Sequence, residues 1–406
     1  MGFGWRGGLR AGRFCPPRAI VGRAVFRSDP CCTVRPVFSK VRSARRIYRE
    51  GGGTELLTAS RNYFGDRILH NALVETELAT KDYFDLSWSR RVALYRRGFL
   101  SQADALYDFA SNDHADYVTD YQRWARTPRI NGEARYEVID KYRFHGALEA
   151  FDEHRPEVFG RLDGGKYYAE PGAAPAPMGA LSAALRSERR LVLKPVTGGG
   201  GGEGVVVCST DGERYVAGGR SMSESEFEAW LASLDEYLVM EFVDQADYAD
   251  ALYPDAANTT RIVTMIDEDG PFAAVIAHRI GTDGSAPLDN WSAGGLSASI
   301  RDDGTLTRAT RYPYGGKLEW FADHPDTGSR IAERTVPNWD SIREKVLRMT
   351  GAMSHVPYIA WDMLPTDDGF KILEGNAHTD VDLLQVHEPL LADDRVRRFY
   401  RRHGVV

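Results

Sequence analysis

Hydrophobic residues recur at two different spacings along the chain, and the change falls near residue 139. Between residues 54 and 126, apolar side chains stand three or four positions apart, as in GDRILHNALVETELA and DYVTDYQRWAR. This period predicts amphipathic helices. Ser101 and Asp104, in SQAD, resemble the capping box of one such helix, with Asp in place of Glu.

After residue 139 the pattern predicts an α/β chain of the α+β type. One helix is expected over IDKYRFHGALEAF, and two more over MGALSAALRSE and SESEFEAWLASL, where Ser223 and Glu226 form a capping box. Short apolar runs predict the strands PEVFG, KYYAE, RLVLKPV, GVVVCS, RYVAG, EYLVMEFV, TRIVTMID, PFAAVIAHRI, YIAWDML and FKILEG. Because many of these runs adjoin tight turns, we expect antiparallel pairing.

Composition narrows the class of protein. The 406 residues are 43% hydrophobic and 27% charged, as in globular domains, and no apolar run reaches the roughly 18 to 20 residues of a membrane helix. The four cysteines lack CxxC spacing, which indicates a reducing compartment and no structural zinc. We therefore expect a cytoplasmic protein, and the sequence does not predict its oligomeric state.

Charge is distributed unevenly. Residues 1–49 hold twelve Lys and Arg and one acidic residue, whereas the whole chain carries −7, so the rest carries −18. An acidic body argues against nucleic acid as the main partner, because phosphates would be repelled. The basic segment 1–49 is expected to be a disordered tail or to result from a start site placed too far upstream. A weaker alternative is an electrostatic anchor for an anionic surface.

Residues 191–207, LVLKPVTGGGGGEGVVV, place a lysine and a glycine run between two strands. A P-loop would need Gly-Lys-Ser/Thr at its end, and a dinucleotide fingerprint would need a helix after Gly204 rather than a β-branched strand. A strand–loop–strand cover over phosphates remains, with Lys194 pointing at them. The alternative is a flexible hairpin tip. The glycines of this cover are Gly198, Gly199, Gly200, Gly201, Gly202 and Gly204.

The segment PTDDG predicts a hairpin between YIAWDML and FKILEGNAH. Folding it back places Asp362 close to opposite Glu374, and Asn376 shares a strand face with Glu374. Two carboxylates and a carboxamide offer the hard oxygen ligands that Mg²⁺ or Mn²⁺ prefer. The alternative is the polar face of an exposed hairpin.

The order of these segments resembles the ATP-grasp superfamily. VMEFV (239–243) is similar to its hinge, and IDKYRFHGAL to the Asp-Lys helix that precedes the grasp domain in D-alanine–D-alanine ligase-like enzymes. The combination NTTRIVT, DNWSAGG and LEGNAHTDVDLLQ is closer to the sugar-transfer associated ATP-grasp branch, often grouped with α-L-glutamate ligase-related proteins. The resemblance covers residues 137–392.

The resemblance implies an ATP-grasp fold, two α+β subdomains clasping ATP after a mainly helical N-terminal region. The expected divisions are the tail 1–49, the helical region 50–136, the grasp domain 137–392 and a C-terminal helix within 393–406. Within the grasp domain, the glycine-loop subdomain covers about 166–237 and the metal-binding subdomain about 238–392.

The resemblance also implies roles for single residues. Lys141 and Lys194 would neutralise the α- and β-phosphates of ATP, and Arg261 and Arg279 would act in catalysis on the transferring phosphoryl group. For these arginines, a surface ion pair is the alternative. The adenine would lie against the hinge residues Glu241, Phe242 and Val243, and the metal would be held by Asp362, Glu374 and Asn376.

A loop and a histidine are candidates for substrate binding. Free amides of Gly294 and Gly295 would suit an anionic group, although an ordinary turn would explain them too. His378 would contact substrate or serve as a hydrogen-bond partner of the site. The substrate candidates are Asn290, Ser292, Gly294, Gly295 and His378.

These expectations point to an ATP- and Mg²⁺-dependent ligase. A carboxylate would attack the γ-phosphorus, ADP would leave, and an amine or related nucleophile would attack the acyl phosphate. The resemblance alone implies a role in polysaccharide or glycoconjugate biosynthesis. The alternatives are a kinase acting on a small-molecule hydroxyl and a non-catalytic nucleotide-binding module.

Overall fold

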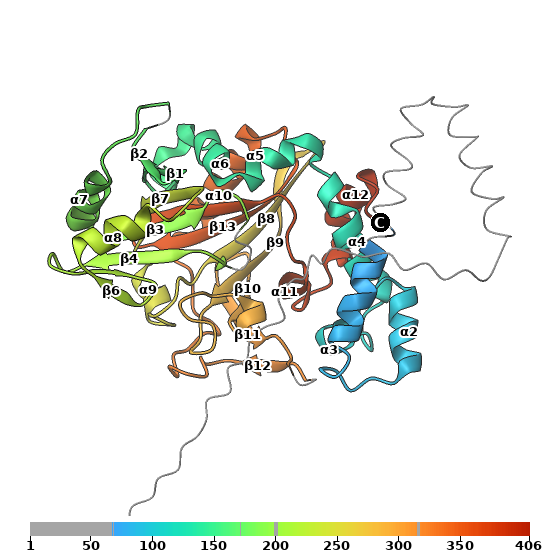
Figure 1. Ribbon diagram of the computed structural model, residues 1–406. Coiled ribbons are helices and arrows are strands. Elements are labelled where there is room, and N and C mark those ends of the chain that lie inside the picture. The colour runs from blue at the N-terminus through green and yellow to red at the C-terminus, as the bar shows by residue number, and fades with distance from the viewer. Residues whose placement is uncertain (1–66, 68, 171, 199–201, 315–316) are drawn as a thin grey trace, which may run out of the picture. The chain divides into compact units, whose positions relative to one another are not determined.

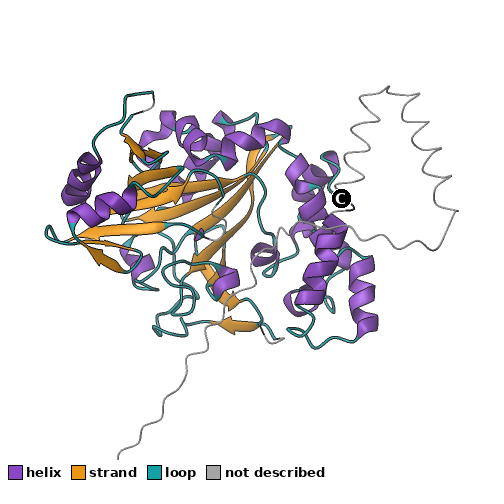
Figure 2. Ribbon diagram, viewed as in Figure 1, coloured by secondary structure: helices purple, strands orange, loops and turns teal. Residues whose placement is uncertain are grey.

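The computed structural model describes residues 67, 69–170, 172–198, 202–314 and 317–406. The chain divides into two compact units, residues 1–67 and 68–406. The predicted tail 1–49 and the predicted residues Gly199, Gly200 and Gly201 lie outside the described residues. The second unit holds two seven-stranded sheets with helices around them (Figures 1 and 2).

Most of the described helices are short. Residues 69–79 form the first helical segment. The α-helices after it are α2 Trp88–Arg96, α3 Gln102–Leu106, α4 Asp120–Ala125, α5 Arg135–Ile139, α6 Lys141–Ala147, α7 Met178–Glu188, α8 Glu224–Leu231, α9 Asp247–Asp250, α10 Trp339–Ala352, α11 Asp382–Gln385 and α12 Asp394–Arg402. Short 3₁₀ turns are η1 His114–Asp116, η2 Thr127–Arg129, η3 Gly132–Ala134, η4 Glu149–His154, η6 Trp291–Ala293 and η7 Leu390–Ala392.

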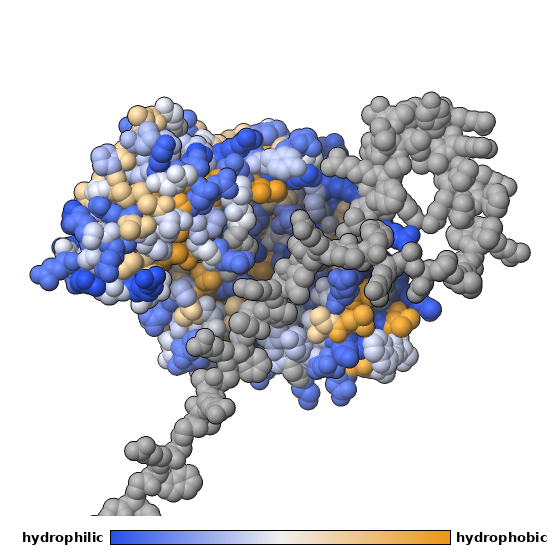
Figure 3. All heavy atoms as spheres, in the orientation of Figure 1, coloured by the Kyte–Doolittle hydropathy of each residue, from blue (hydrophilic) through white to orange (hydrophobic). Residues whose placement is uncertain are grey.

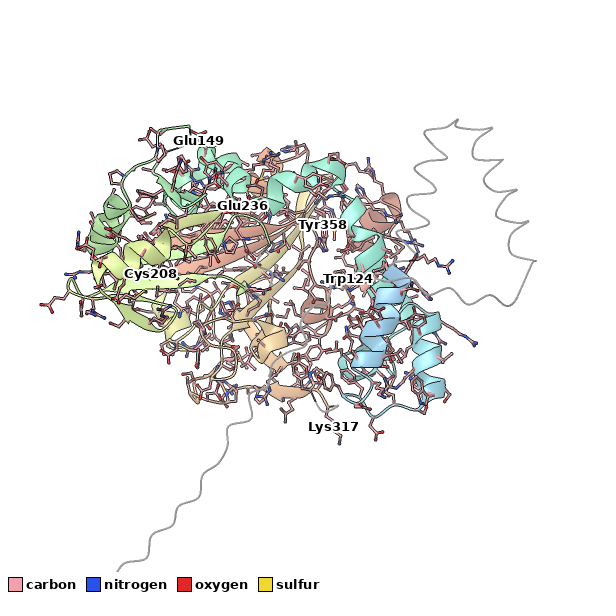
Figure 4. All side chains as sticks on the ribbon, in the orientation of Figure 1. Trp124, Glu149, Cys208, Glu236, Lys317 and Tyr358 are labelled. Atoms are coloured by element: carbon pink, nitrogen blue, oxygen red, sulfur yellow. The ribbon has the colours of Figure 1, made fainter. Side chains whose placement is uncertain are left out.

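The first sheet has the order β2-β1-β7-β3-β4-β5-β6, and every neighbouring pair is antiparallel. Its strands are β1 Val158–Asp163, β2 Lys166–Tyr168, β3 Arg190–Pro195, β4 Val206–Thr210, β5 Tyr215–Ala217, β6 Arg220–Met222 and β7 Tyr237–Glu241. Helices α7 and α8 share a core with this sheet, which includes Leu193, Cys208 and Phe227. Cys208, labelled in Figure 4, lies within β4 as a buried free thiol.

The second sheet has the order β12-β11-β10-β9-β8-β13-β14 and is also antiparallel. Its strands are β8 Thr260–Asp267, β9 Gly270–Ile280, β10 Leu296–Ile300, β11 Leu306–Arg311, β12 Glu319–Phe321, β13 Tyr358–Thr366 and β14 Gly369–Asn376. Residues 358–365 of β13 are all buried, because both faces are covered. Helices α5, α6 and α10 lie on one face, and the N-terminal helices with α11 and α12 lie on the other.

The face of the molecule drawn in Figure 3 is mostly hydrophilic. Apolar atoms show over the N-terminal helices, where Leu78 and Val92 are 50% and 45% exposed. Within the described residues, no helix is long and apolar enough to cross a membrane.

Most predicted elements are confirmed, and three local predictions need correction. The single helix expected over residues 139–151 is broken at Asp140, whose side chain accepts the Tyr142 and Arg143 amides and starts α6. The capping box at Ser101 is wrong, because its hydroxyl bonds Glu77 and Arg91 instead. The predicted subdomain border at residue 238 falls inside β7, which pairs in the first sheet.

Other elements agree closely with the pattern. The capping box of Ser223 and Glu226 is present at α8, and the C-terminal helix is α12. The hairpin of β13 and β14 pairs Asp362 with Glu374, as predicted.

Candidate active site

The two predicted phosphate-binding lysines both adjoin the start of the glycine run. Lys194 lies near the end of β3, half-buried. Lys141 begins α6, where its backbone amide donates to the Val196 carbonyl at 3.0 Å and its Nζ donates to the Gly198 carbonyl at 2.8 Å. The helix start and the glycine run are therefore held together by Lys141.

The second sheet places a carboxylate within reach of Lys194. Burial lowers the pKa of Lys194, while the charges of Glu374 and Asp362 act to raise it. Burial and the charge of Asp362 raise the pKa of Glu374, and Lys194 and Lys141 oppose this rise. The candidate residues of the two sheets thus share one electrostatic neighbourhood.

Arg261 and Asp362 form a buried bidentate ion pair between β8 and β13. Arg261 Nε donates to Asp362 Oδ1 and Nη2 donates to Oδ2, both at 2.7 Å. The two side chains lie on directly paired residues and are 8% and 2% exposed. Burial alone would raise the pKa of Asp362, but the charges of Arg261 and Arg279 hold it well below its usual range.

Arg279, on β9, joins the same carboxylate. Its Nη2 donates to Asp362 Oδ2 at 3.2 Å and to the Thr259 hydroxyl at 2.6 Å. That hydroxyl donates to Asp289 Oδ2 at 2.5 Å, and Asp289 Oδ1 lies 3.3 Å from Arg279 Nη2. Both predicted catalytic arginines are therefore brought together at Asp362, rather than forming surface ion pairs.

The predicted metal ligands lie together on the β13–β14 hairpin. Asn376 Nδ2 is buried and has no hydrogen-bond partner. Its amide oxygen and nitrogen exchange by a half-turn, so the position can offer an acceptor. In the described part of the chain no three His, Cys, Asp or Glu side chains converge, so an amide would have to complete a set with Glu374 and Asp362.

The donor chemistry at this hairpin fits Mg²⁺ or Mn²⁺. A carboxylate offers about four lone-pair positions. Those of Asp362 already accept three N–H donors from Arg261 and Arg279, which leaves about one for a metal. Glu374 and Asn376 would therefore supply most of the protein ligands, and Asp362 at most one.

The helices α5 and α6 lie directly on β14, the predicted metal strand. A Cβ added at Gly375 would come 2.6 Å from the Phe144 ring and 3.0 Å from Val138. Glycine at this position allows the helix that begins with Lys141 to approach the strand that carries Glu374 and Asn376.

The predicted adenine hinge lies at the end of β7. Glu241 Oε2 accepts the Glu157 amide at 2.9 Å and lies 3.8 Å from Lys371 Nζ. The Phe242 ring is covered by the Arg190 guanidinium at 4.0 Å, and Val243 is half-buried. These contacts keep the Glu241 carboxylate at the strand end, and its role toward adenine stays a prediction.

The described end of the glycine run meets the other sheet's loops. Gly202 has φ +81°, and a Cβ there would come 2.4 Å from the Leu288 side chain. Leu288 precedes Asp289, so this glycine lies against the segment that anchors Arg279. At Gly204, with φ +78°, a Cβ would come 2.8 Å from Pro195.

The loop DNWSAGG does not offer the amides that the sequence suggested. Gly294 N donates to the Trp291 carbonyl and Gly295 N donates to the Asn290 carbonyl, at 3.1 and 3.0 Å. The expectation of free amides is therefore wrong, since both close a turn. Ser292 donates to Asn290 Oδ1 at 3.2 Å, so this pair is also engaged within the loop.

His378 lies just beyond β14, the predicted metal strand. Its half-buried ring meets the Trp124 ring edge-on at 6.2 Å. Burial and then the charges of Arg123 and Arg135 lower the pKa of His378, which favours the neutral imidazole near neutral pH.

Sequence reasoning missed the residues that support the arginines. Thr379 accepts Arg261 Nη1 on its hydroxyl and Arg123 Nε on its carbonyl, both at 3.2 Å. Thr259 and Asp289 hold Arg279, and both stand inside segments that the sequence singled out. Thr259, Asp289 and Thr379 all stand inside the motifs NTTRIVT, DNWSAGG and LEGNAHTDVDLLQ, and that position was the available signal.

Comparison with known families decides the classification. The sequence model described as sugar-transfer associated ATP-grasp matches residues 124–397, about two thirds of the chain. This chain belongs to the sugar-transfer associated ATP-grasp family. The match includes every predicted site residue, from Lys141 to His378, and confirms the resemblance and the ATP-grasp fold of two antiparallel sheets after a helical region.

Three solved structures show some likeness to this chain, and one of them is an ATP-grasp ligase by name. An N5-carboxyaminoimidazole ribonucleotide synthetase in complex with ADP is 14% identical over 61% of this chain and 46% of its own, with a TM-score of 0.34. The ATP-grasp ligase PsnB, complexed with a minimal precursor, Mg and ADP, is 11% identical over 68% and 62%, with a TM-score of 0.34.

A D-alanine–D-alanine ligase from Bacillus anthracis is 12% identical over 66% of this chain and 67% of its own, with a TM-score of 0.36. The first of these likenesses thus spans less than half of the other protein. Among curated proteins, none matches this chain.

Proposed function

We propose that this protein is an ADP-forming ligase that uses ATP and Mg²⁺ to activate a carboxylate for attack by an amine or related nucleophile. The observation that carries the proposal is the buried Arg261–Asp362–Arg279 cluster, beside Glu374 and within electrostatic reach of Lys194. Positive groups from both sheets face one carboxylate pair, which suits a polyphosphate with its metal.

The residues divide the work by sheet. Lys141 and Lys194 would neutralise the non-transferred phosphates from the first sheet, and the glycine run would cover them. Arg261 and Arg279 would face the transferring phosphoryl group from the second sheet. Their guanidinium groups are already oriented by Asp362 and Thr259, so little reorganisation is needed during the reaction.

The chemistry needs two displacements. An oxygen of the carboxylate forms a bond to the γ-phosphorus as the bond to ADP breaks, and the product is an acyl phosphate. The amine then bonds to the acyl carbon, phosphate leaves, and the amine gives up a proton. His378 follows the predicted metal ligand Asn376 by two residues and would accept that proton.

Mg²⁺ at Glu374 and Asn376 would supply charge neutralisation for the phosphates. Glu374 would also need positive charge beside it, because burial and the charge of Asp362 raise its pKa and so disfavour the ionised carboxylate. A divalent cation or the nearby lysines would favour its ionised form.

Family membership supports a role with saccharide-containing substrates, in polysaccharide or glycoconjugate biosynthesis. The partners would be a small-molecule acid and a small-molecule nucleophile. A cytoplasmic location remains a proposal that rests on cysteine usage.

A hydroxylamine trap tests the proposal. The full chain would be incubated with Mg·ATP, pooled carboxylic acids and hydroxylamine, which converts an acyl phosphate into a hydroxamate. We expect ADP and hydroxamate in equal amounts with one class of acid. A phosphoester formed without hydroxamate would establish the kinase alternative, and nucleotide binding without any turnover would establish a non-catalytic module.

A further inference from the structure

Two exposed aromatic side chains stand on the helices beside the predicted metal strand. Trp124 on α4 and Tyr136 on α5 are 43% and 47% exposed, although such large rings are usually more buried. An arginine covers each ring: the guanidinium carbon of Arg123 lies 3.9 Å from the Trp124 centroid, and that of Arg135 lies 4.7 Å from the Tyr136 centroid. Each pair presents a ring and a positive charge at one place.

His378 lies beside the first of these pairs. Its imidazole lies edge-on to Trp124, which Figure 4 labels on α4, at 6.2 Å between centroids. The guanidinium carbon of Arg123 lies 3.9 Å from the centroid of the same Trp124 ring. Arg123, Trp124 and His378 therefore border a single surface.

The same surface continues into the arginine cluster through Thr379. Arg123 Nε donates to the Thr379 carbonyl, and Arg261 Nη1 donates to the Thr379 hydroxyl, each at 3.2 Å. Arg123 and one buried threonine thus connect the exposed ring of Trp124 to the arginine bound to Asp362.

The surface carries charges of both signs. Asp380 lies 3.6 Å from Arg123 Nη2 with its side chain 45% exposed, and the charge of Arg123 also acts on the buried carboxyl groups of Asp120 and Asp382. Arg135 bonds the Tyr136 hydroxyl at 2.9 Å, which leaves its charge in place. A guanidinium with further N–H donors suits a carboxylate ligand.

We propose that this surface binds the carboxylate substrate, and that the substrate is a ring-bearing acid. The inference rests on the proposed ligase function, and it assigns the helical region α4–α5 to substrate selection. The carboxylate lies beside Thr379, next to Arg261, and the ring of the acid lies against Trp124. The planar apolar face of Trp124 favours a sugar ring or an aromatic ring over a linear chain.

Calorimetric titration of the full chain, with Mg²⁺ and the non-hydrolysable analogue AMP-PNP present, tests the class of acid. The probes are D-glucuronate and benzoate, with acetate as the acid without a ring and D-glucose as the ring without an acid. We expect at least one ring acid to bind tenfold or more tightly than acetate and D-glucose. Whether D-glucuronate or benzoate binds more tightly identifies the ring. Equal binding of acetate and both ring acids, or no binding of either ring acid, would overturn the proposal.

Variants locate the site. Trp124→Ala should weaken binding of the ring acid at least tenfold, and Trp124→Phe, which keeps a ring, should restore most of it. Trp88→Ala is the matched control, because Trp88 is 63% exposed and Arg91 lies 5.9 Å from its ring centroid. Unchanged ring-acid binding in Trp124→Ala contradicts the assignment.

AMP-PNP affinity is measured separately in every variant and should not change. Failure of the unaltered protein to bind AMP-PNP would contradict the proposed ligase function. A ring acid that still binds in a Trp124-dependent way would then support the surface by itself. The ligase function and the acid-binding surface are therefore tested by separate measurements.

Discussion

The two sheets hold their candidate residues in opposite ways. In the first sheet, half-buried Lys194 lies near a strand end beside glycines, and Lys141 reaches the glycine run through one carbonyl contact. In the second sheet, Arg261 and Asp362 lie inside paired strands, are almost fully buried, and bond each other through two short contacts.

Buried ion pairs hold the candidate arginines of the second sheet. We call the second sheet the fixed side of the site and the first sheet the adjustable side. Buried charges cost desolvation free energy, so the second sheet retains its arginines only because Asp362, Thr259 and Thr379 pair with them. In return, their donors need no reorientation when charge develops in a transition state. The first sheet carries no comparable ion-pair cluster around Lys194 in the residues described.

The fixed side depends most on Asp362. Asp362→Asn should lower the free energy of unfolding by about 3–5 kcal/mol, because it leaves Arg261 buried without its counter-charge and removes one of the two acids beside Arg279. Urea unfolding at pH 7 measures the loss. Asp323→Asn is the control, since Asp323 and Arg330 form an ion pair at 3.2 Å with both side chains 56% exposed, and should cost less than about 1 kcal/mol. Equal losses in the two variants would remove the distinction between the sheets.

Glu374→Gln should affect turnover rather than folding. We expect ADP release to fall at least about 100-fold, because a predicted metal ligand is lost at the reaction centre. Burial and the charge of Asp362 raise the pKa of Glu374, so ionisation at pH 7 costs folding free energy, and the neutral amide should leave stability equal or higher. Glu319→Gln, at an exposed pair with Arg311, is the control. Full turnover in Glu374→Gln would contradict the assigned site.

The sequence was sufficient for features that depend on local pattern. The strand runs, the capping box at Ser223 and the Asp362–Glu374 pairing follow from spacing and from one tight hairpin. The break at Asp140 was not predicted, because the apolar period continues through it while a single polar side chain caps α6.

Features that depend on distant contacts were not predictable from spacing. Arg261 and Asp362 are 101 residues apart in the sequence, and only the pairing of β8 with β13 brings them together. The sequence therefore predicted Asp362 as a metal ligand and missed that it orients two arginines. The role of Arg123 is equally hidden, because its contact with Thr379 joins segments 256 residues apart. The Gly294 and Gly295 amides were misjudged because glycine permits a tight turn as readily as an anion site.

Asp120 is a second buried acid, on the helical side of the second sheet, and its pKa is shifted in the opposite direction to that of Asp362. Asp120 accepts the Leu100 amide at 2.8 Å, and burial raises its pKa from 3.8 to about 6, with Asp380 adding to the rise and Arg123 opposing it. Its folded pKa exceeds the unfolded value, so its stability contribution is present below about pH 4 and is lost as pH rises through about 6.

Asp120→Asn should therefore reduce this pH-dependent loss by roughly 2 kcal/mol between pH 4 and pH 7, measured by urea unfolding at both pH values. Asp382 shares this buried cluster through Gln102, which donates to both carboxylates, so a double variant with Asp382→Asn would show less than additive change. Asp108→Asn is the control of opposite sign, because hydrogen bonds from Ser111 lower the pKa of Asp108. The same pH dependence in Asp120→Asn and the unaltered protein would contradict the assignment.

The adjustable side depends on glycine where the loop meets Leu288. Gly202→Ala places a Cβ 2.4 Å from the Leu288 side chain at a φ of +81°, so the Leu288 side chain or the loop must shift at the segment that holds Arg279. We expect ADP release to fall about tenfold, equivalent to about 1.4 kcal/mol, with a change in unfolding free energy of no more than about 1 kcal/mol. Gly146→Ala is the matched control, because a Cβ there meets nothing within 4 Å. If Gly202→Ala instead lost stability as Asp362→Asn does while keeping its turnover, the glycine side would be as fixed as the arginine side, and the contrast between the sheets would fail.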